Sequence, residues 1–149
     1  MRRLRAQLAD DESGSTLLLT IGCCVLGLAV IIVTIGATSL YLERKRLFTI
    51  ADGAALAGAE AFALADVRRE GDRLVVDLAP ADVSAAVAEH LAASVGVDSD
   101  VRVVHATSVD GRSATVTLGT VWRAPIVGEF LPAEVPIEVT SVARSVFSG

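Results

Sequence analysis

The chain is poor in the residues that build disulfide scaffolds and aromatic-rich cores. Its 149 residues include two cysteines, four prolines and only 4% aromatic residues. The two cysteines, Cys23 and Cys24, are neighbours in sequence, and adjacent cysteines in a helix do not normally bridge each other. The rest of the chain therefore has no disulfide and no cysteine-based metal site.

Clustered positive charge is also missing. The chain has 13 Lys and Arg against 18 Asp and Glu, which gives a net charge of -5, and the charges are scattered. A nucleic-acid partner would require Lys and Arg gathered on one face or segment. We therefore expect no nucleic-acid partner.

No group of side chains has the spacing of a catalytic or cofactor site. The sequence has no phosphate-cradling glycine loop and no nucleophile elbow. His90, next to Leu91 on the core side of an expected helix, and His105, in an expected strand, lack a second ligand at suitable spacing. The acidic run at 10–12 is expected to keep the N-terminal tail solvated. We expect no enzyme, no metal, no cofactor and no small-molecule substrate.

What the chain does contain is a long apolar run. It is 52% hydrophobic with a mean hydropathy of +0.57, and no charged residue occurs from Ser13 to Leu42. The 26 residues from Leu17 to Leu42 would extend about 39 Å as a helix, longer than the roughly 30 Å hydrocarbon core. A cleaved signal peptide has an apolar core of only about 7–15 residues. We predict a retained transmembrane helix over 15–42; a lipid anchor on Cys23 is the weaker alternative because its preceding "TIGC" fits a lipobox poorly.

The orientation of this span depends on the size of the parts that flank it. Basic residues lie on both sides, so the positive-inside rule gives a tie. They are Arg2, Arg3 and Arg5 before the run, and Arg44, Lys45 and Arg46 after it. A short tail stays inside more readily than a domain. We expect 1–14 to be cytoplasmic and the C-terminal part to be extracytoplasmic, with the whole chain a single-pass protein of the cell membrane.

A helix is predicted to continue beyond the span through 43–65, because no proline or turn signal interrupts it. At 100° per residue, small residues gather in one sector of this helix while Asp52 lies on the opposite side. The sector contains Leu47, Ala51, Ala54, Gly58, Ala61 and Ala65, and within the span Gly22, Ala29, Gly36 and Leu40. Small residues allow close approach of another helix in lipid. Beyond the lipid, the same face can instead pack on the chain's own sheet.

The C-terminal part, 66–149, is predicted to be a small α+β domain. We read "DVRREGDR" as a charged turn, then a strand over 73–78, a helix from Pro80 to Gly96, and strands over 101–107, 113–122 and 137–146. The dipeptide Asp110–Gly111 is a strong hairpin signal. The expected order is β-α-β-β-β, with helices on one side of a small antiparallel sheet.

The anchor and its continuation resemble the N-terminal region of TadE/TadG-like proteins of the Flp (Tad) pilus assembly system. "DESGS" precedes the apolar run, and "SLYLERKRLFTIADGAALAGAEAF" follows it. The residues that match the family pattern are Glu12, Gly14, Asp52, Ala54, Ala55, Leu56, Ala57, Gly58 and Ala59. The resemblance implies a bacterial single-pass membrane protein that assists pilus assembly or secretion, with the lipid bilayer and other pilus-assembly membrane proteins or pilin-like helices as partners.

The resemblance also raises the question of N-terminal processing. Pilin-like members are cut after a glycine, which here places the bond between Gly14 and Ser15. The glutamate expected five residues after that glycine is replaced by Leu19. We therefore favour an uncleaved, TadG-like component. The alternatives are a membrane-tethered binding or regulatory domain, and a secreted domain released by signal peptidase.

Overall fold

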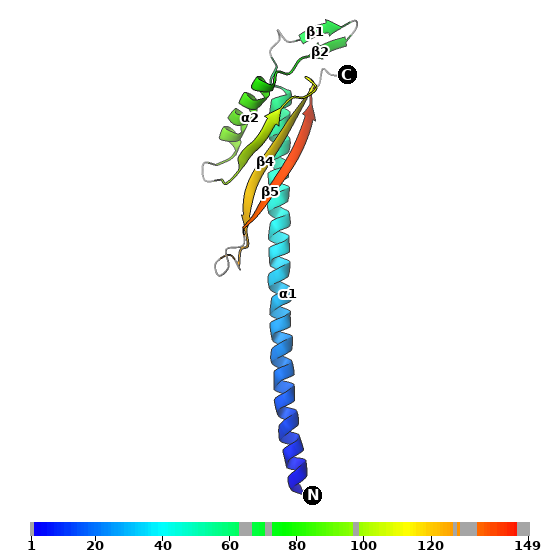
Figure 1. Cartoon of the computed structure of the whole chain (residues 1–149), viewed down its shortest axis with the longest axis vertical. Helices are drawn as coiled ribbons and strands as arrows, with labels where there is room; N and C mark the ends of the chain where they lie inside the picture. Colours follow the sequence, from blue (N-terminus) through cyan, green and yellow to red (C-terminus); the bar gives the residue numbers. More distant parts are fainter. Residues whose placement is uncertain are drawn as a thin grey trace. The chain divides into compact units, whose positions relative to one another are not determined.

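The computed structural model describes residues 2–62, 67–70, 73–96, 99–126, 128 and 134–145. Its first element is the long helix α1, Arg2–Ala59 (Figure 1). The chain divides into two compact units, residues 1–39 and residues 40–149. The first unit is helix throughout its described length, and the second contains the end of α1, a second helix and all the strands.

Within the first unit, the helix satisfies its own polar groups. The hydroxyls of Thr20 and Thr34 donate to the carbonyl oxygens of Thr16 and Val30, each at 2.8 Å. Both hydroxyl donors therefore have a partner within the helix. Lipid offers no hydrogen-bond acceptor in its hydrocarbon core, so such internal bonds suit a helix that lies in it.

The helix ends at Ala59, short of the expected end at Ala65. The Ala61 N–H donates to the Gly58 carbonyl at 3.3 Å, which tightens the last turn. Phe62 then packs against the domain core. Residues 63–66 lie outside the described part of the chain.

A hairpin follows where we expected a turn and then a single strand. The strand β1, Val67–Glu70, pairs antiparallel with β2, Arg73–Val76. The prediction of 67–70 as a charged turn is wrong. Charge alone does not exclude a strand there, because β-propensity depends strongly on the surroundings of each residue. β2 belongs to this two-stranded sheet and not to the main sheet.

Helix α2, Pro80–Ser94, begins at the predicted proline. Proline suits the first helical turn because its missing N–H has no partner there in any case. The N–H of Val95 donates to the Leu91 carbonyl at 2.9 Å at the other end. Val83 and Val87 are the fully buried residues of this helix.

The main sheet has three antiparallel strands in the order β3-β4-β5 (Figure 1). They are β3, Arg102–Thr107, β4, Ser113–Arg123, and β5, Glu134–Arg144. The predicted turn joins β3 to β4: the Asp110 carboxylate accepts the N–H groups of Arg112 at 2.9 Å and Ser113 at 2.7 Å, and Gly111 has φ 65°. These two backbone hydrogen bonds lower the pKa of Asp110.

Strand β5 begins at Glu134, earlier than the predicted start at residue 137, so Pro136 lies within the strand. Pro136 pairs with Val121 in the register of β4 and β5. The N–H of Ser145 donates to Arg112 at the far end of this ladder. Because N–H directions alternate along a strand, residue 136 directs its nitrogen to the open edge of the sheet, where a proline is tolerated.

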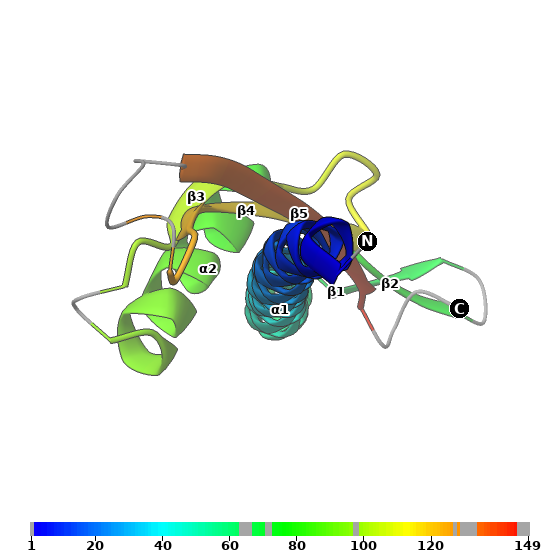
Figure 2. The same cartoon turned by 90° about the horizontal axis from the view of Figure 1, so that it is seen from below.

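Both α2 and the end of α1 lie on one face of the three-stranded sheet (Figure 2). Alternate residues of β4 point into that layer, and the α+β class with helices on one side is confirmed. The buried hydrophobic core is Leu47, Ala51, Ala54, Ala55, Ala59, Leu78, Val83, Val87, Ala114, Val116, Leu118, Ile137 and Val139. Large side chains come from α2 and the sheet, while α1 contributes mainly alanine.

Candidate functional site: the apolar span and the small-residue face

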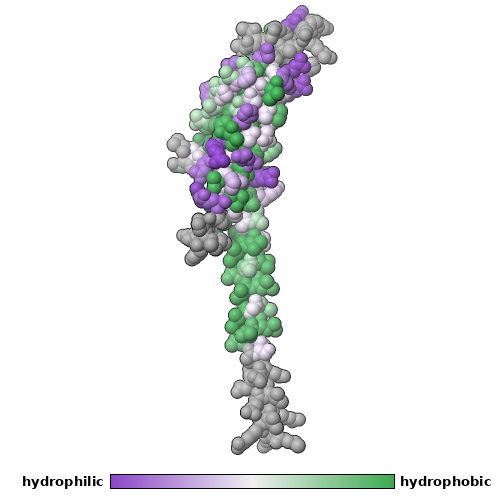
Figure 3. All heavy atoms as spheres, viewed as in Figure 1, coloured by the Kyte–Doolittle hydropathy of each residue, from purple (hydrophilic) through white to green (hydrophobic). Residues whose placement is uncertain are grey.

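The apolar stretch of α1 is long enough to cross a membrane. By length and composition, Ser15–Ala59 is the one candidate span in the described part of the chain, with a hydropathy of 2.8 in its most apolar window. None of that window is buried. The apolar band is visible along α1 in Figure 3. Its bulky residues are exposed, and Leu18 is 77% exposed. A helix that is apolar all round and not covered by protein is suited to a lipid solvent.

The predicted packing residues of the span have open space around them. Gly22 and Ala29 are exposed and Gly36 is partly exposed. A Cβ added at Gly22 or Gly36 would meet no other atom within 4 Å. A second helix could therefore approach the backbone at these two positions without displacing any described part of this chain.

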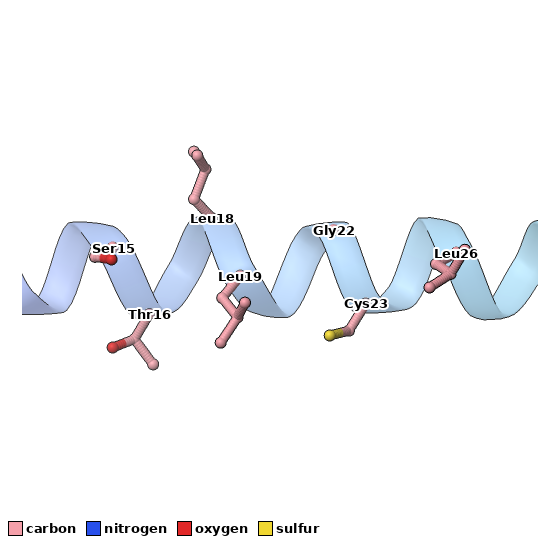
Figure 4. Close-up of a pocket in the computed structure, with 7 residues that line it drawn as sticks. All are labelled: Ser15, Thr16, Leu18, Leu19, Gly22, Cys23 and Leu26. Atoms are coloured by element: carbon pink, nitrogen blue, oxygen red, sulfur yellow. The ribbon is translucent and has the colours of Figure 1, made fainter.

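A shallow notch surrounds Gly22. It is lined by Ser15, Thr16, Leu18, Leu19, Gly22, Cys23 and Leu26. All seven residues belong to α1, and Figure 4 shows Leu18 directed away from Leu19 and Cys23. The lining side chains diverge from one helix and enclose nothing. This notch fits a side chain of a neighbouring helix better than it fits a small ligand.

Beyond the span, the small-residue face is covered by the chain's own domain. Ala51 and Ala54 are completely buried. A Cβ at Gly58 would lie 3.1 Å from the Ala114 Cβ, 3.1 Å from Val83 Cγ1 and 3.3 Å from Val87 Cγ2. These atoms come from β4 and α2, so glycine permits α1 to approach both at once. In this part of α1, the small-residue face therefore packs on the chain's own sheet and on α2.

The buried face is wider than the predicted sector. Ala55 and Ala59 are also in the core, whereas Leu56 is 52% exposed and Ala57 is partly exposed. The alanine string of the family pattern therefore contains core positions at the boundary between helix and sheet. The breadth arises because α2 and the sheet contact α1 from two directions, which a single-stripe analysis does not anticipate.

Asp52 lies at the rim of this face rather than on a purely solvated side. Its carboxylate accepts a hydrogen bond from the Ser141 hydroxyl of β5. Ser141 is 7% exposed, so the bond satisfies a polar group at the edge of the core. No local pattern indicates this pairing, because the two residues are far apart along the chain and only the fold brings them together.

Two other predicted features have defined positions. The His90 ring lies against α1, since a Cβ at Gly53 would be 3.2 Å from its Nε2. His105 is exposed on β3. Within the described ranges, no three residues among His, Cys, Asp and Glu gather in a way that could hold a metal ion.

The proposed processing residues lie in the N-terminal part of α1. Glu12 and Gly14 fall within α1, and Ser15 is exposed. Processing between Gly14 and Ser15 stays a prediction.

A comparison with known protein families covers both the apolar span and the small-residue face of α1. Residues 14–61 match the family model described as "Putative Flp pilus-assembly TadE/G-like". The match includes Gly14, Asp52 and the Ala-Gly string but begins after Glu12. No curated protein and no solved structure matches the chain. The resemblance inferred from the sequence is therefore confirmed for the span and the helix face that follows it.

Proposed function

We propose a function from one premise, namely that residues 14–61 belong to the TadE/G-like family of Flp pilus-assembly proteins. The chain is a membrane-anchored component of a Flp/Tad-type pilus assembly or secretion system, and its role is structural rather than catalytic. The observation that carries this proposal is the division of one helix into an uncovered apolar span and a buried alanine face.

The division suggests a distinct role for each part of α1. Residues 15–42 hold the protein in the bilayer as a single-pass anchor, with the tail at 1–14 in the cytoplasm. Residues 43–59 form the structural base of the domain, which lies outside the cytoplasm. Because α1 supplies five of the buried hydrophobic residues, the domain core includes the end of its own anchor.

The span is proposed to contact a second transmembrane helix through Gly22, Ala29 and Gly36. These residues recur every seven positions, which places them on one side of the helix. In lipid the hydrophobic effect does not join two helices, so close packing at small residues supplies much of the attraction. The partner is another pilus-assembly membrane protein or a pilin-like helix.

The test must separate assembly from folding. Leucine at Ala54 or Gly58 would overpack the domain core, so loss of pili in such a variant would not report on a partner. The informative variant is Gly22→Leu combined with Gly36→Leu. Gly27→Leu is the matched control, because Gly27 also has open space around it but lies on another side of the helix.

Pilus production and cross-linking to neighbouring helices are the readouts, at equal amounts of protein in the membrane. The proposal predicts that the double variant loses pili and cross-links while Gly27→Leu retains both. Equal behaviour of the two variants would contradict it. Mass measurement of the mature chain decides the remaining question: an intact N-terminus supports the uncleaved anchor, and a start at Ser15 supports pilin-like processing.

A further inference from the structure

We propose that the free edge of β5 binds an extended segment of another protein, which adds a fourth, antiparallel strand to the main sheet. The segment has two apolar side chains with a Lys or Arg midway between them. The site lies wholly within residues 40–149, so it is separate from the helix contact proposed for the span.

The strand β5 borders the main sheet. Its one strand neighbour in the described part of the chain is β4. The Ser145 N–H donates to the Arg112 carbonyl across the sheet at 3.0 Å, so the odd-numbered residues of β5 bond β4. Glu138, Thr140 and Val142 therefore direct their N–H and carbonyl groups outward. A row of such groups is a template on which another strand can pair.

The side chains of this row do not obstruct a fourth strand. Thr140 Oγ1 lies 2.9 Å from Thr117 Oγ1 of β4. Glu138 Oε1 lies 3.8 Å from Arg102 Nη2 of β3, on the far side of β4. Both side chains are thus held over the sheet. The charge of Glu138 would protect the free edge if it were unpaired, but here Arg102 balances it.

The side of α1 next to β5 is apolar and exposed. Asp52 identifies this side, because its carboxylate accepts a hydrogen bond from the Ser141 hydroxyl of β5. Phe48 and Leu56 lie one turn before and one turn after Asp52, and they are 46% and 52% exposed. In Figure 2, α1 lies under β5 while α2 lies under β3. A strand added to β5 would cover both apolar side chains and remove them from water.

The spacing of these residues sets the pattern that the segment must have. Leu56 follows Phe48 by two turns of α1, a distance of about 12 Å along the helix. Residues i and i+4 of a strand are about 13 Å apart and point to the same face. Apolar side chains at i and i+4 therefore match Phe48 and Leu56, and the residue at i+2 lies opposite Asp52.

The charge of Asp52 selects the residue at i+2. Asp52 is exposed, and Oδ1 is the oxygen that accepts from the Ser141 hydroxyl. A carboxylate accepts hydrogen bonds on both oxygens, so Oδ2 can accept one from a Lys or Arg of the segment. An Asp or Glu at the same place would meet a like charge.

The border strands of a second copy do not supply this chemistry. In β5, the side chains that face the helices include Ile137, Val139 and Ser141, and no basic residue is among them. In β3, the other border of the sheet, Arg102 bonds Glu138 on the face away from the helices. The segment therefore belongs to another protein.

The first test uses two short labelled peptides and the full-length protein in detergent micelles. One peptide has the core Val-Thr-Lys-Thr-Val, and the matched control has Glu in place of Lys. Fluorescence anisotropy measures their binding, with empty micelles as the background. We expect the Lys peptide to bind at least about tenfold more tightly, because the control replaces an attractive contact with a repulsive one. No binding of the Lys peptide, or equal binding of the two peptides, would overturn the proposal.

Asp52→Asn tests the residue that recognises the charge. Asparagine keeps an oxygen that can accept from the Ser141 hydroxyl, so the contact with β5 is retained while the charge is removed. We expect this variant to bind both peptides equally. Glu89→Gln removes an exposed carboxylate from α2 and should leave the preference for the Lys peptide unchanged. A preference that persists in Asp52→Asn, or that both variants lose equally, would overturn the proposal.

N-methylated peptides test the backbone pairing without any change to the protein. In an antiparallel pair, opposite residues share a face, so the two Thr residues of the peptide core lie opposite the outward-facing residues of β5 and donate to them. The N–H of the Lys points away from β5. N-methylation of both Thr residues should abolish binding, and N-methylation of the Lys should leave it unchanged. Equal effects of the two modifications would overturn the proposal.

Val142→Pro tests whether a second copy occupies the edge instead. The substitution removes one outward N–H, and a strand tolerates proline where its nitrogen faces the open edge, as at Pro136. We expect the variant to lose the Lys peptide and to have the same oligomeric state as the parent in detergent, measured by light scattering. A parent dimer that Val142→Pro dissociates would show that a second copy binds the edge, and this result would overturn the proposal.

Discussion

Gly58→Ala tests whether close packing of α1 determines the stability of the domain. The added methyl would lie 3.1 Å from Ala114 Cβ and Val83 Cγ1, and 3.3 Å from Val87 Cγ2. These contacts are tighter than normal carbon contacts, which are near 3.5–4.0 Å. They come from two elements on different sides, so no single shift relieves all three.

The expected cost exceeds the gain in helix propensity. Alanine stabilises a helix interior by up to about 1 kcal/mol relative to glycine. Gly58 is the penultimate residue of α1, so its gain is smaller. Overpacking costs about 1–3 kcal/mol. We therefore expect Gly58→Ala to lower the free energy of unfolding by about 1–2 kcal/mol, which lowers the melting temperature of a domain of this size by about 4–8 °C per kcal/mol.

Gly53→Ala is the matched control on the same helix. Its added Cβ would meet only the His90 ring, at 3.2 Å from Nε2, and the end of a side chain can move. We expect this variant to be at least as stable as the parent. Thermal unfolding of the full-length protein in detergent, followed through Trp122 fluorescence, measures both changes. A Gly58→Ala variant that is as stable as Gly53→Ala would refute the packing argument.

Three further predictions concern contacts within the domain. In urea titrations, Ser141→Ala should reduce the free energy of unfolding by about 0.5–1.5 kcal/mol. The same substitution should cost much less in an Asp52→Ala background, and equal losses in both backgrounds would show that the hydrogen bond between the two residues contributes nothing. Gly111→Ala should cost about 1–2 kcal/mol in the same assay, because φ is 65° and the new Cβ would lie 2.6 Å from Asp77 Oδ1; an unchanged midpoint would contradict this. The pKa of Asp110 is lowered by backbone hydrogen bonds, so its stabilising contribution is complete above its ordinary value of 3.8 and is lost as pH falls through the lowered pKa. Asp110→Ala should therefore unfold with a weaker dependence on pH in this acidic range, and an unaltered acid transition would exclude that role.

Local sequence signals were sufficient for most of the domain. Pro80 marks the start of α2, and Asp110–Gly111 marks the hairpin of β3 and β4, because these residues act through their own backbone preferences. The alternation of residues over 113–122 predicted a strand, and the structure contains β4 there. By contrast, β1 was missed because its residues are mostly charged. Pro136 was left out of the predicted strand, because a strand tolerates proline only where the missing N–H faces the open edge of the sheet. Edge position is a property of the fold and not of the local sequence.

The candidate site divides in the same way. The small-residue face was visible as a periodic pattern, but a pattern does not say which surface covers it. For Ala51, Ala54 and Gly58 the covering surface is the domain itself. The hydrogen bond between Asp52 and Ser141 depends on how β5 lies against α1. This pairing cannot be derived from spacing in the sequence.

The central claim is that residues 15–42 stay in the membrane and hold the domain outside the cytoplasm. Val109→Cys in the Cys23→Ala, Cys24→Ala background places a single reactive thiol on an exposed turn of the domain. Spheroplasts of producing cells would be treated with a maleimide that does not cross membranes, and the membranes would then be washed with carbonate. We expect a labelled protein that remains in the washed membranes. Labelling that occurs only after lysis, or labelled protein in the soluble fraction, would contradict the claim.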